Sequence, residues 1–235
     1  MGQIIEQGIV VSIGNQKGGV GKSVITSLVA NYIHQVWGKK LKIVVVDCDD
    51  LQSSLYKLRE RDLELPFDTK TENYRLLQIS SEDFPKQTEL LIDEYDIVFV
   101  DLPGNLKQSG VMSCYNMVDV LITPTQTSSL DLQSTFDFVK MYKETIVPTR
   151  DKYDLKTVIC GLFSRVDVQN IEFKELNSEG ARKVLPIEFL QNYVPESKVA
   201  FQRNVSTINA YENSKYFNYQ DLCEEILAKI TSVRE

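Results

Sequence analysis

Apolar runs rich in Val, Ile and Leu recur along the chain and alternate with segments of helical spacing. Five of these runs are nearly continuous in apolar residues and have the length of strands, and a shorter run predicts a sixth strand. They cover residues 8–14, 41–49, 96–102, 119–125 and 155–164, with the short run at 184–189. Such continuous runs are typical of parallel strands that are covered on both faces.

Three segments between the runs are predicted to be helical. Residues 23–38 have apolar residues at helical spacing and end at Gly38, which suits a helix C-terminus. Residues 81–95 contain a second helix, and a long third helix covers about 128–146. The alternation predicts an α/β fold with a doubly wound, mostly parallel sheet and helices on both faces. We expect residues 1–235 to form a single domain.

Composition and charge exclude several classes of protein. No apolar run approaches the roughly 20 residues that cross a bilayer, and the first residues lack the pattern of a signal peptide. We therefore expect a cytoplasmic protein. The four cysteines are far apart and His34 is the only histidine, so neither a metal cluster nor a disulfide framework is expected. The net charge of −7 argues against attraction of nucleic acid to the whole surface but permits a local basic patch.

The first candidate site is the stretch GNQKGGVGKS at 14–23, which joins the first strand to the first helix. Its glycines allow backbone N–H groups to surround phosphate oxygens, and the helix start adds the positive end of its dipole. Lys22 can reach the β- and γ-phosphates of a nucleotide, and the Ser23 hydroxyl can ligate Mg²⁺. We expect a continuous nucleotide-binding set: Gly18, Gly19, Val20, Gly21, Lys22, Ser23 and Val24.

The strand 41–49 ends in an acidic cluster, Asp47, Asp49 and Asp50. Taken alone, these carboxylates fit two interpretations equally well. They form either a solvated strand end that caps the following helix, or a site that positions Mg²⁺ and the attacking water. The neighbouring phosphate loop favours the second interpretation, because ligands of doubly wound sheets bind at the carboxyl ends of the strands.

The strand 96–102 carries the third element, Asp101, in the arrangement of a Walker B motif. We expect Asp101 to hold Mg²⁺, through a bound water. Gly104 follows in a Pro-Gly loop, and we expect this loop to sense the γ-phosphate. An apolar strand that ends in aspartate is weak evidence alone, but its place after the other two elements strengthens it.

These stretches together resemble the ParA/MinD family of ATPases with a deviant Walker A motif. The resemblance rests on KGGVGKS at 17–23, DIVFVDLPG at 96–104 and DVLITPTQTSSLDLQST at 119–135, and it covers most of residues 8–165. The tract at 44–62 is most similar to small ParA-like partition proteins of mobile elements, although Leu51 stands where they have proline.

The resemblance implies two ATP molecules held with Mg²⁺ between the subunits of a homodimer. Lys22 then acts on the nucleotide of its own subunit, and Lys17 crosses the interface to contact the partner's phosphates. Of two aspartates in the family's pattern, the first is Asp47, a metal and catalytic residue, and the second orients the attacking water. Counting from the strand makes the second Asp49, whereas aligning on Gln52 makes it Asp50; we prefer Asp49.

The adenine pocket of the family implies two further residues. Arg165 in FSRVD and Pro195 in YVPES are placed to pack on the base, and the alternatives are a surface arginine and a turn proline.

The function that the resemblance implies is ATP-dependent DNA partition. An ATP-bound dimer would bind DNA without sequence specificity at the nucleoid, and a ParB-like protein would activate hydrolysis. The basic residues available for DNA are scattered among acids, so a solvated face is the alternative. They are Arg182, Lys183, Lys198, Arg203 and Lys215. The alternative function is a positioning ATPase for a protein cargo or a membrane-associated machine. The helix predicted near the C-terminus has acids among its polar residues, so we expect it on the core and not on a membrane.

Overall fold

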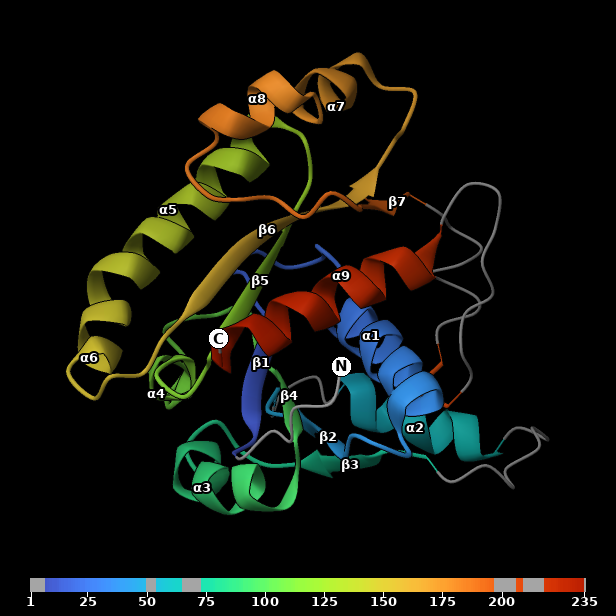
Figure 1. The fold of residues 1–235 in the computed structure, drawn as a ribbon, viewed down its shortest axis with the longest axis vertical. Helices are drawn as coiled ribbons and strands as arrows, with labels where there is room; N and C mark the ends of the chain where they lie inside the picture. Colours follow the sequence, from blue (N-terminus) through green and yellow to red (C-terminus); the bar gives the residue numbers. More distant parts are fainter. Residues whose placement is uncertain (1–6, 50–53, 65–72, 197–205, 209–217, 235) are drawn as a thin grey trace.

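The computed structural model describes residues 7–49, 54–64, 73–196, 206–208 and 218–234, and is built around one seven-stranded sheet (Figure 1). The strands lie in the order β3-β2-β4-β1-β5-β6-β7, and every pairing is parallel. They are β1 (Ile9–Ile13), β2 (Ile43–Asp47), β3 (Arg75–Gln78), β4 (Ile97–Asp101), β5 (Val120–Thr125), β6 (Val158–Val166) and β7 (Val194–Pro195). The predicted doubly wound α/β fold is confirmed.

Helices cover both faces of this sheet (Figure 1). They are α1 (Lys22–Trp37), α2 (Ser54–Glu64), α3 (Phe84–Glu94), α4 (Val111–Tyr115), α5 (Ser129–Thr145), α6 (Val147–Asp151), α7 (Ile171–Leu176), α8 (Glu179–Val184) and α9 (Tyr219–Thr231). Side chains of β1 alternate between two buried clusters, as strand geometry requires. Ile9, Val11 and Ile13 pack with α1 and α9, whereas Val10 packs with α3, α4 and α5.

The five long strands that the sequence predicts are present with slightly shorter bounds, but the sixth was placed wrongly. Val184 is the last residue of α8, and of the segment 184–189 only Phe189 forms a bridge, to Gly161. The edge of the sheet is formed instead by β7. The strand β3 was not predicted, because it is short and its side chains are only half-buried or exposed.

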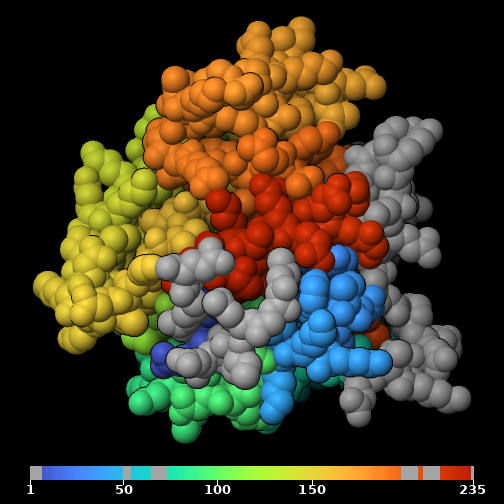
Figure 2. Space-filling view, in the orientation of Figure 1, coloured from blue at the N-terminus to red at the C-terminus, as the bar shows by residue number. Residues whose placement is uncertain are grey.

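The three predicted helices correspond to α1, α3 and α5. Figure 2 shows α9 (red) at the surface between α1 (blue) and the segment of α7 and α8 (orange). The apolar side chains of α9, which include Leu222 and Ile226, are buried against the core, as predicted. Within the described ranges, no helix has the length and apolar character to cross a membrane. The four cysteines are buried free thiols.

Candidate functional site

The phosphate loop leaves the centre of the sheet, because β1 lies between β4 and β5. Gly19 and Gly21 have φ angles of 74° and 94°, in the left-handed region that favours glycine, and α1 begins directly afterwards at Lys22. The space beside Gly18 is open. The loop therefore has the backbone conformation and the helix start that phosphate binding requires.

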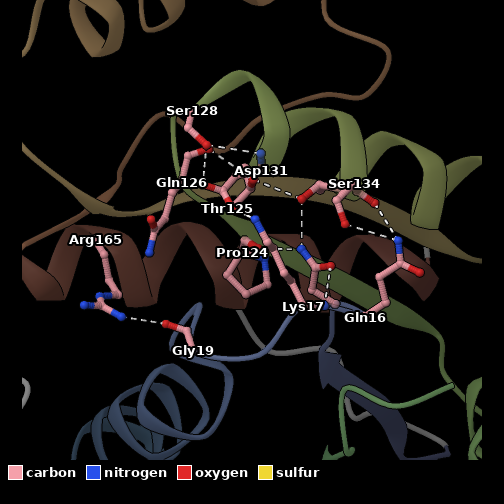
Figure 3. Close-up of polar contacts among 12 residues, drawn as sticks. Gln16, Lys17, Gly19, Pro124, Thr125, Gln126, Ser128, Asp131, Ser134 and Arg165 are labelled. Atoms are coloured by element: carbon pink, nitrogen blue, oxygen red, sulfur yellow. Dashed lines mark hydrogen bonds and ion pairs between the residues drawn. The ribbon is translucent and has the colours of Figure 1, made fainter.

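The first half of the loop is held by side chains of its own (Figure 3). The buried amide of Asn15 donates from Nδ2 to the Pro124 carbonyl and to Thr135 Oγ1, both at 2.9 Å. Asn15 Oδ1 accepts from the Lys17 N–H at 3.1 Å. Gln16 Nε2 donates to the Ser134 carbonyl at 2.9 Å. Consecutive loop residues are thus fixed to the end of β5 and to the first turns of α5.

Lys22 is the first residue of α1, and other predicted site residues lie close to it. Its Nζ donates to the Lys17 carbonyl at 3.1 Å. Burial lowers the pKa of the Lys22 ammonium, and the charges of Asp101 and Asp49 partly oppose this. A Cβ placed on Gly104 would lie 3.2 Å from Lys22 Nζ. The Pro-Gly loop therefore approaches the cation that is predicted to hold the phosphates.

Asp101 ends β4 beside Ser23 and is 2% exposed. The Ser23 hydroxyl hydrogen-bonds to its carboxylate. Within the described structure, the carboxylate oxygen Oδ1 has no hydrogen-bond partner. Burial raises the pKa of Asp101 to about 7, and the Ser23 hydrogen bond only partly opposes this. A buried carboxylate oxygen without a donor, next to a hydroxyl, fits a magnesium site, because Mg²⁺ prefers oxygen ligands.

Asp47 is buried opposite Asp101 in the register of β2 and β4, and it caps α2. Its Oδ2 accepts from the N–H groups of Leu55 and Tyr56 at 3.0 and 3.1 Å, and its Oδ1 accepts from the Asp49 N–H at 3.1 Å. The helix-capping interpretation thus describes the contacts of Asp47, and a metal ion would have to compete with these three donors. Asp49 is half-buried, while Asp50 and Gln52 lie outside the described residues.

Arg165 and Pro195 lie at the β6–β7 side of the site. Arg165 is exposed at a bulge at the end of β6, with a φ of 55°, and its Nη1 donates to the Gly19 carbonyl at 2.8 Å (Figure 3). This strained backbone aims its side chain at the phosphate loop. Pro195 is buried in β7 opposite Val166, so the alternative of a turn proline is wrong.

A family model for the CobQ/CobB/MinD/ParA nucleotide-binding domain matches residues 11–206. The chain belongs to this family. Comparison with curated proteins gave no match.

Several solved structures have the same fold as this chain. The cell division ATPase MinD of Pyrococcus furiosus matches with a TM-score of 0.65 and 19% identity, over 94% of this chain and 99% of that one. A protein of Borrelia burgdorferi assigned to plasmid partition, bound to AMPPNP, matches with a TM-score of 0.58 and 21% identity, over 96% of this chain and 99% of that one. Cobyrinic acid a,c-diamide synthase of Mycobacterium smegmatis, with a bound ATP analogue and magnesium, matches with a TM-score of 0.63 and 17% identity, over 94% of each chain.

The basic residues proposed for DNA are only partly available. Arg182 is half-buried and donates to the carbonyls of Phe189 and Leu190 at 3.1 and 2.6 Å, so it holds the chain beside α8 and is not a free surface cation. Lys183 is exposed and paired with Glu179 at 2.7 Å. Lys198, Arg203 and Lys215 lie outside the described residues.

Three residues of α5 contact the loop and were not identified as site residues from the sequence. They are Asp131, Ser134 and Thr135, which face the loop from α5. Ser128 and Asp131 have the spacing of a capping box, which could have located the start of α5. The spacing carries no signal for the contact with the loop, because that contact depends on how the helix packs.

Proposed function

We propose that this chain is a Mg²⁺-dependent ATPase whose subunits dimerise on ATP and which acts in DNA partition. The unpaired, buried oxygen of Asp101 beside Ser23 and the phosphate loop is the observation that carries the ATP and Mg²⁺ assignment. The ATP analogue and magnesium bound by the structurally similar synthase support it.

The chain's residues then have separate tasks. The loop N–H groups and Lys22 bind the phosphates, while Ser23 and Asp101 hold the cation. Mg²⁺, when bound, offsets the negative charge of the phosphates. Asp49 orients the attacking water, and Arg165 contacts the adenine side of the nucleotide.

In the proposed dimer, each subunit supplies one more group, Lys17, to the site of its partner. Lys17 crosses the interface to the partner's phosphates, which makes hydrolysis conditional on dimerisation. A cation at this place is most effective in a site that is closed to water.

The proposed cargo is DNA, and a ParB-like protein is the proposed activator. The similarity to the Borrelia protein supports partition. Since the chain has a net charge of −7, the DNA contact must be local, and the dimer strengthens it by placing two patches side by side.

Gel shifts on unrelated duplexes, with ATP, ADP or no nucleotide, test this function across a salt series. We expect binding that requires ATP, is indifferent to sequence and weakens steeply as salt rises. Replacing Lys198 and Arg203 together with Glu should weaken DNA binding and leave ATP binding intact. If a protein that dimerises with ATP does not bind DNA at low salt, the positioning of a protein cargo becomes the better proposal.

A further inference from the structure

The Lys17 side chain, which the proposed function sends across a dimer interface, is already paired within its own subunit. Its ammonium forms an ion pair with Asp131, in the first turn of α5 (Figure 3). The Asp131 side chain is 12% exposed and that of Lys17 is 37% exposed. One ammonium cannot occupy this contact and the partner's site at the same time.

The backbone around Lys17 is fixed, so the change needed to free the side chain is local. The Lys17 N–H donates to Asn15 Oδ1 at 3.1 Å, and its carbonyl accepts from Lys22 Nζ at 3.1 Å. Gln16 is tied to Ser134. Release of the ammonium therefore requires rotation of a side chain and no rearrangement of the loop.

Asp131 is in turn fixed at the start of α5. Its other oxygen, Oδ2, accepts from the Ser128 hydroxyl, and its N–H donates to Ser128 Oγ at 3.2 Å. The positive end of the helix dipole also favours a carboxylate here. The Asp131 carboxylate is therefore held in place, whereas the Lys17 ammonium can leave it by rotation about the bonds of its side chain.

We propose that Asp131 is a positioning residue that holds Lys17 in cis and sets the protein concentration at which ATP drives dimerisation. The inference rests on the proposed function, because it assumes that Lys17 acts in trans. A half-exposed ion pair changes an equilibrium by up to about five-fold. Two pairs open when one dimer forms, so the dimer dissociation constant changes by up to roughly 25-fold.

Asp131→Asn tests this, because it removes the charge and keeps the shape and the acceptor for Ser128. In sedimentation with a slowly hydrolysed ATP analogue, we expect the variant to dimerise more tightly than wild type, by up to roughly 25-fold. In a Lys17→Ala background the same substitution should have no effect on dimerisation. Ser128→Ala is the matched control: it weakens the helix cap and should lower the melting temperature without tightening the dimer.

A second measurement uses the nucleotide-free chain, so that it does not depend on dimerisation. Trace acylation with acetic anhydride, read by mass spectrometry and normalised to Lys183, reports the reactivity of the Lys17 amine. We expect it to rise by up to about five-fold in Asp131→Asn. Unchanged Lys17 reactivity, or a dimer no tighter than wild type, overturns the inference. If wild type and variant both fail to dimerise while Lys17 reactivity rises, the proposed dimerisation is wrong and the threshold role of Asp131 is overturned with it, although the ion pair stands.

Discussion

Replacing Asp101 with Asn should stabilise the nucleotide-free chain while removing its metal site. Burial raises the pKa of Asp101 from its ordinary 3.8 to about 7 in the folded chain. One pKa unit corresponds to about 1.4 kcal/mol, so ionised Asp101 costs the folded state at most about 4 kcal/mol. Asn has the same shape and carries no charge, so the variant avoids this cost.

Because the pKa of Asp101 is raised, the pH range in which its charge costs stability can be predicted. Between pH 3.8 and about 7 the folded chain binds a proton at Asp101 that the unfolded chain has lost. The contribution of Asp101 to the free energy of unfolding therefore falls as pH rises through this window and is constant above it. The advantage of Asp101→Asn should be near zero at about pH 4 and should grow to at most about 4 kcal/mol at pH 8.

Urea denaturation at several pH values, with EDTA and without nucleotide, measures this difference. Asp47→Asn is the control, because Asp47 is equally buried but has three backbone donors. Burial also raises the pKa of Asp47, but these donors partly oppose the shift. An Asn side chain cannot accept from all three donors, so Asp47→Asn should gain less stability at pH 8 than Asp101→Asn. With Mg²⁺ and ATP the order should reverse for Asp101, since wild type gains the free energy of binding. An Asp101→Asn protein that is less stable than wild type at pH 8, or a difference that does not vary with pH, would refute the reasoning.

Four further predictions concern the phosphate loop and its surroundings. Lys22→Ala should weaken ATP binding by roughly 100-fold, measured by calorimetry, because a charged contact contributes about 3 kcal/mol; unchanged affinity would contradict the site. Lys17→Ala should bind ATP normally but form weaker ATP-dependent dimers in sedimentation and hydrolyse ATP more slowly, and wild-type dimerisation and turnover would contradict the trans role. Asp49→Ala should accumulate an ATP-bound dimer with little hydrolysis, and normal turnover would exclude Asp49 as the water-orienting residue. Gly104→Ala should slow ATP hydrolysis, because its methyl group would lie 3.2 Å from Lys22 Nζ and shift the cation that is proposed to bind the phosphates; unchanged turnover would exclude this role of the Pro-Gly loop.

The sequence predicts the central strands well because their apolar runs are long. Strand β1 and its neighbours are buried on both faces, so burial alone determines their residue types. The edge strands lack this signal. β3 has half-buried and exposed side chains, and β7 contains two residues. The apolar run at 184–189 predicted a strand, but its residues divide between the end of α8 and a single bridge at Phe189.

The site residues divide in the same way, into those that local spacing predicts and those that depend on packing. The glycines and Lys22 could be predicted because their spacing is set by a local loop. The contact between Lys17 and Asp131 joins residues 114 positions apart, and only packing of α5 beside the loop brings them together. Asp47 shows the opposite case. Its residue type permits metal binding and helix capping alike, and only the N–H groups of α2 show which contact it makes.

The central place of β1 also has a consequence for synthesis. Both hydrogen-bonded neighbours of β1, β4 and β5, come later in the chain, and α9, which packs on α1, comes later still. While the ribosome is still translating the residues before β4, the phosphate loop has been made but its strand has no partner on either side. The contacts of Asn15 with Pro124 and Thr135, which hold the loop, likewise cannot form until β5 and the first turns of α5 have emerged. Until then β1 can pack only on α1, which directly follows it, and both of its strand edges are unpaired, a state that makes an incomplete chain prone to aggregate.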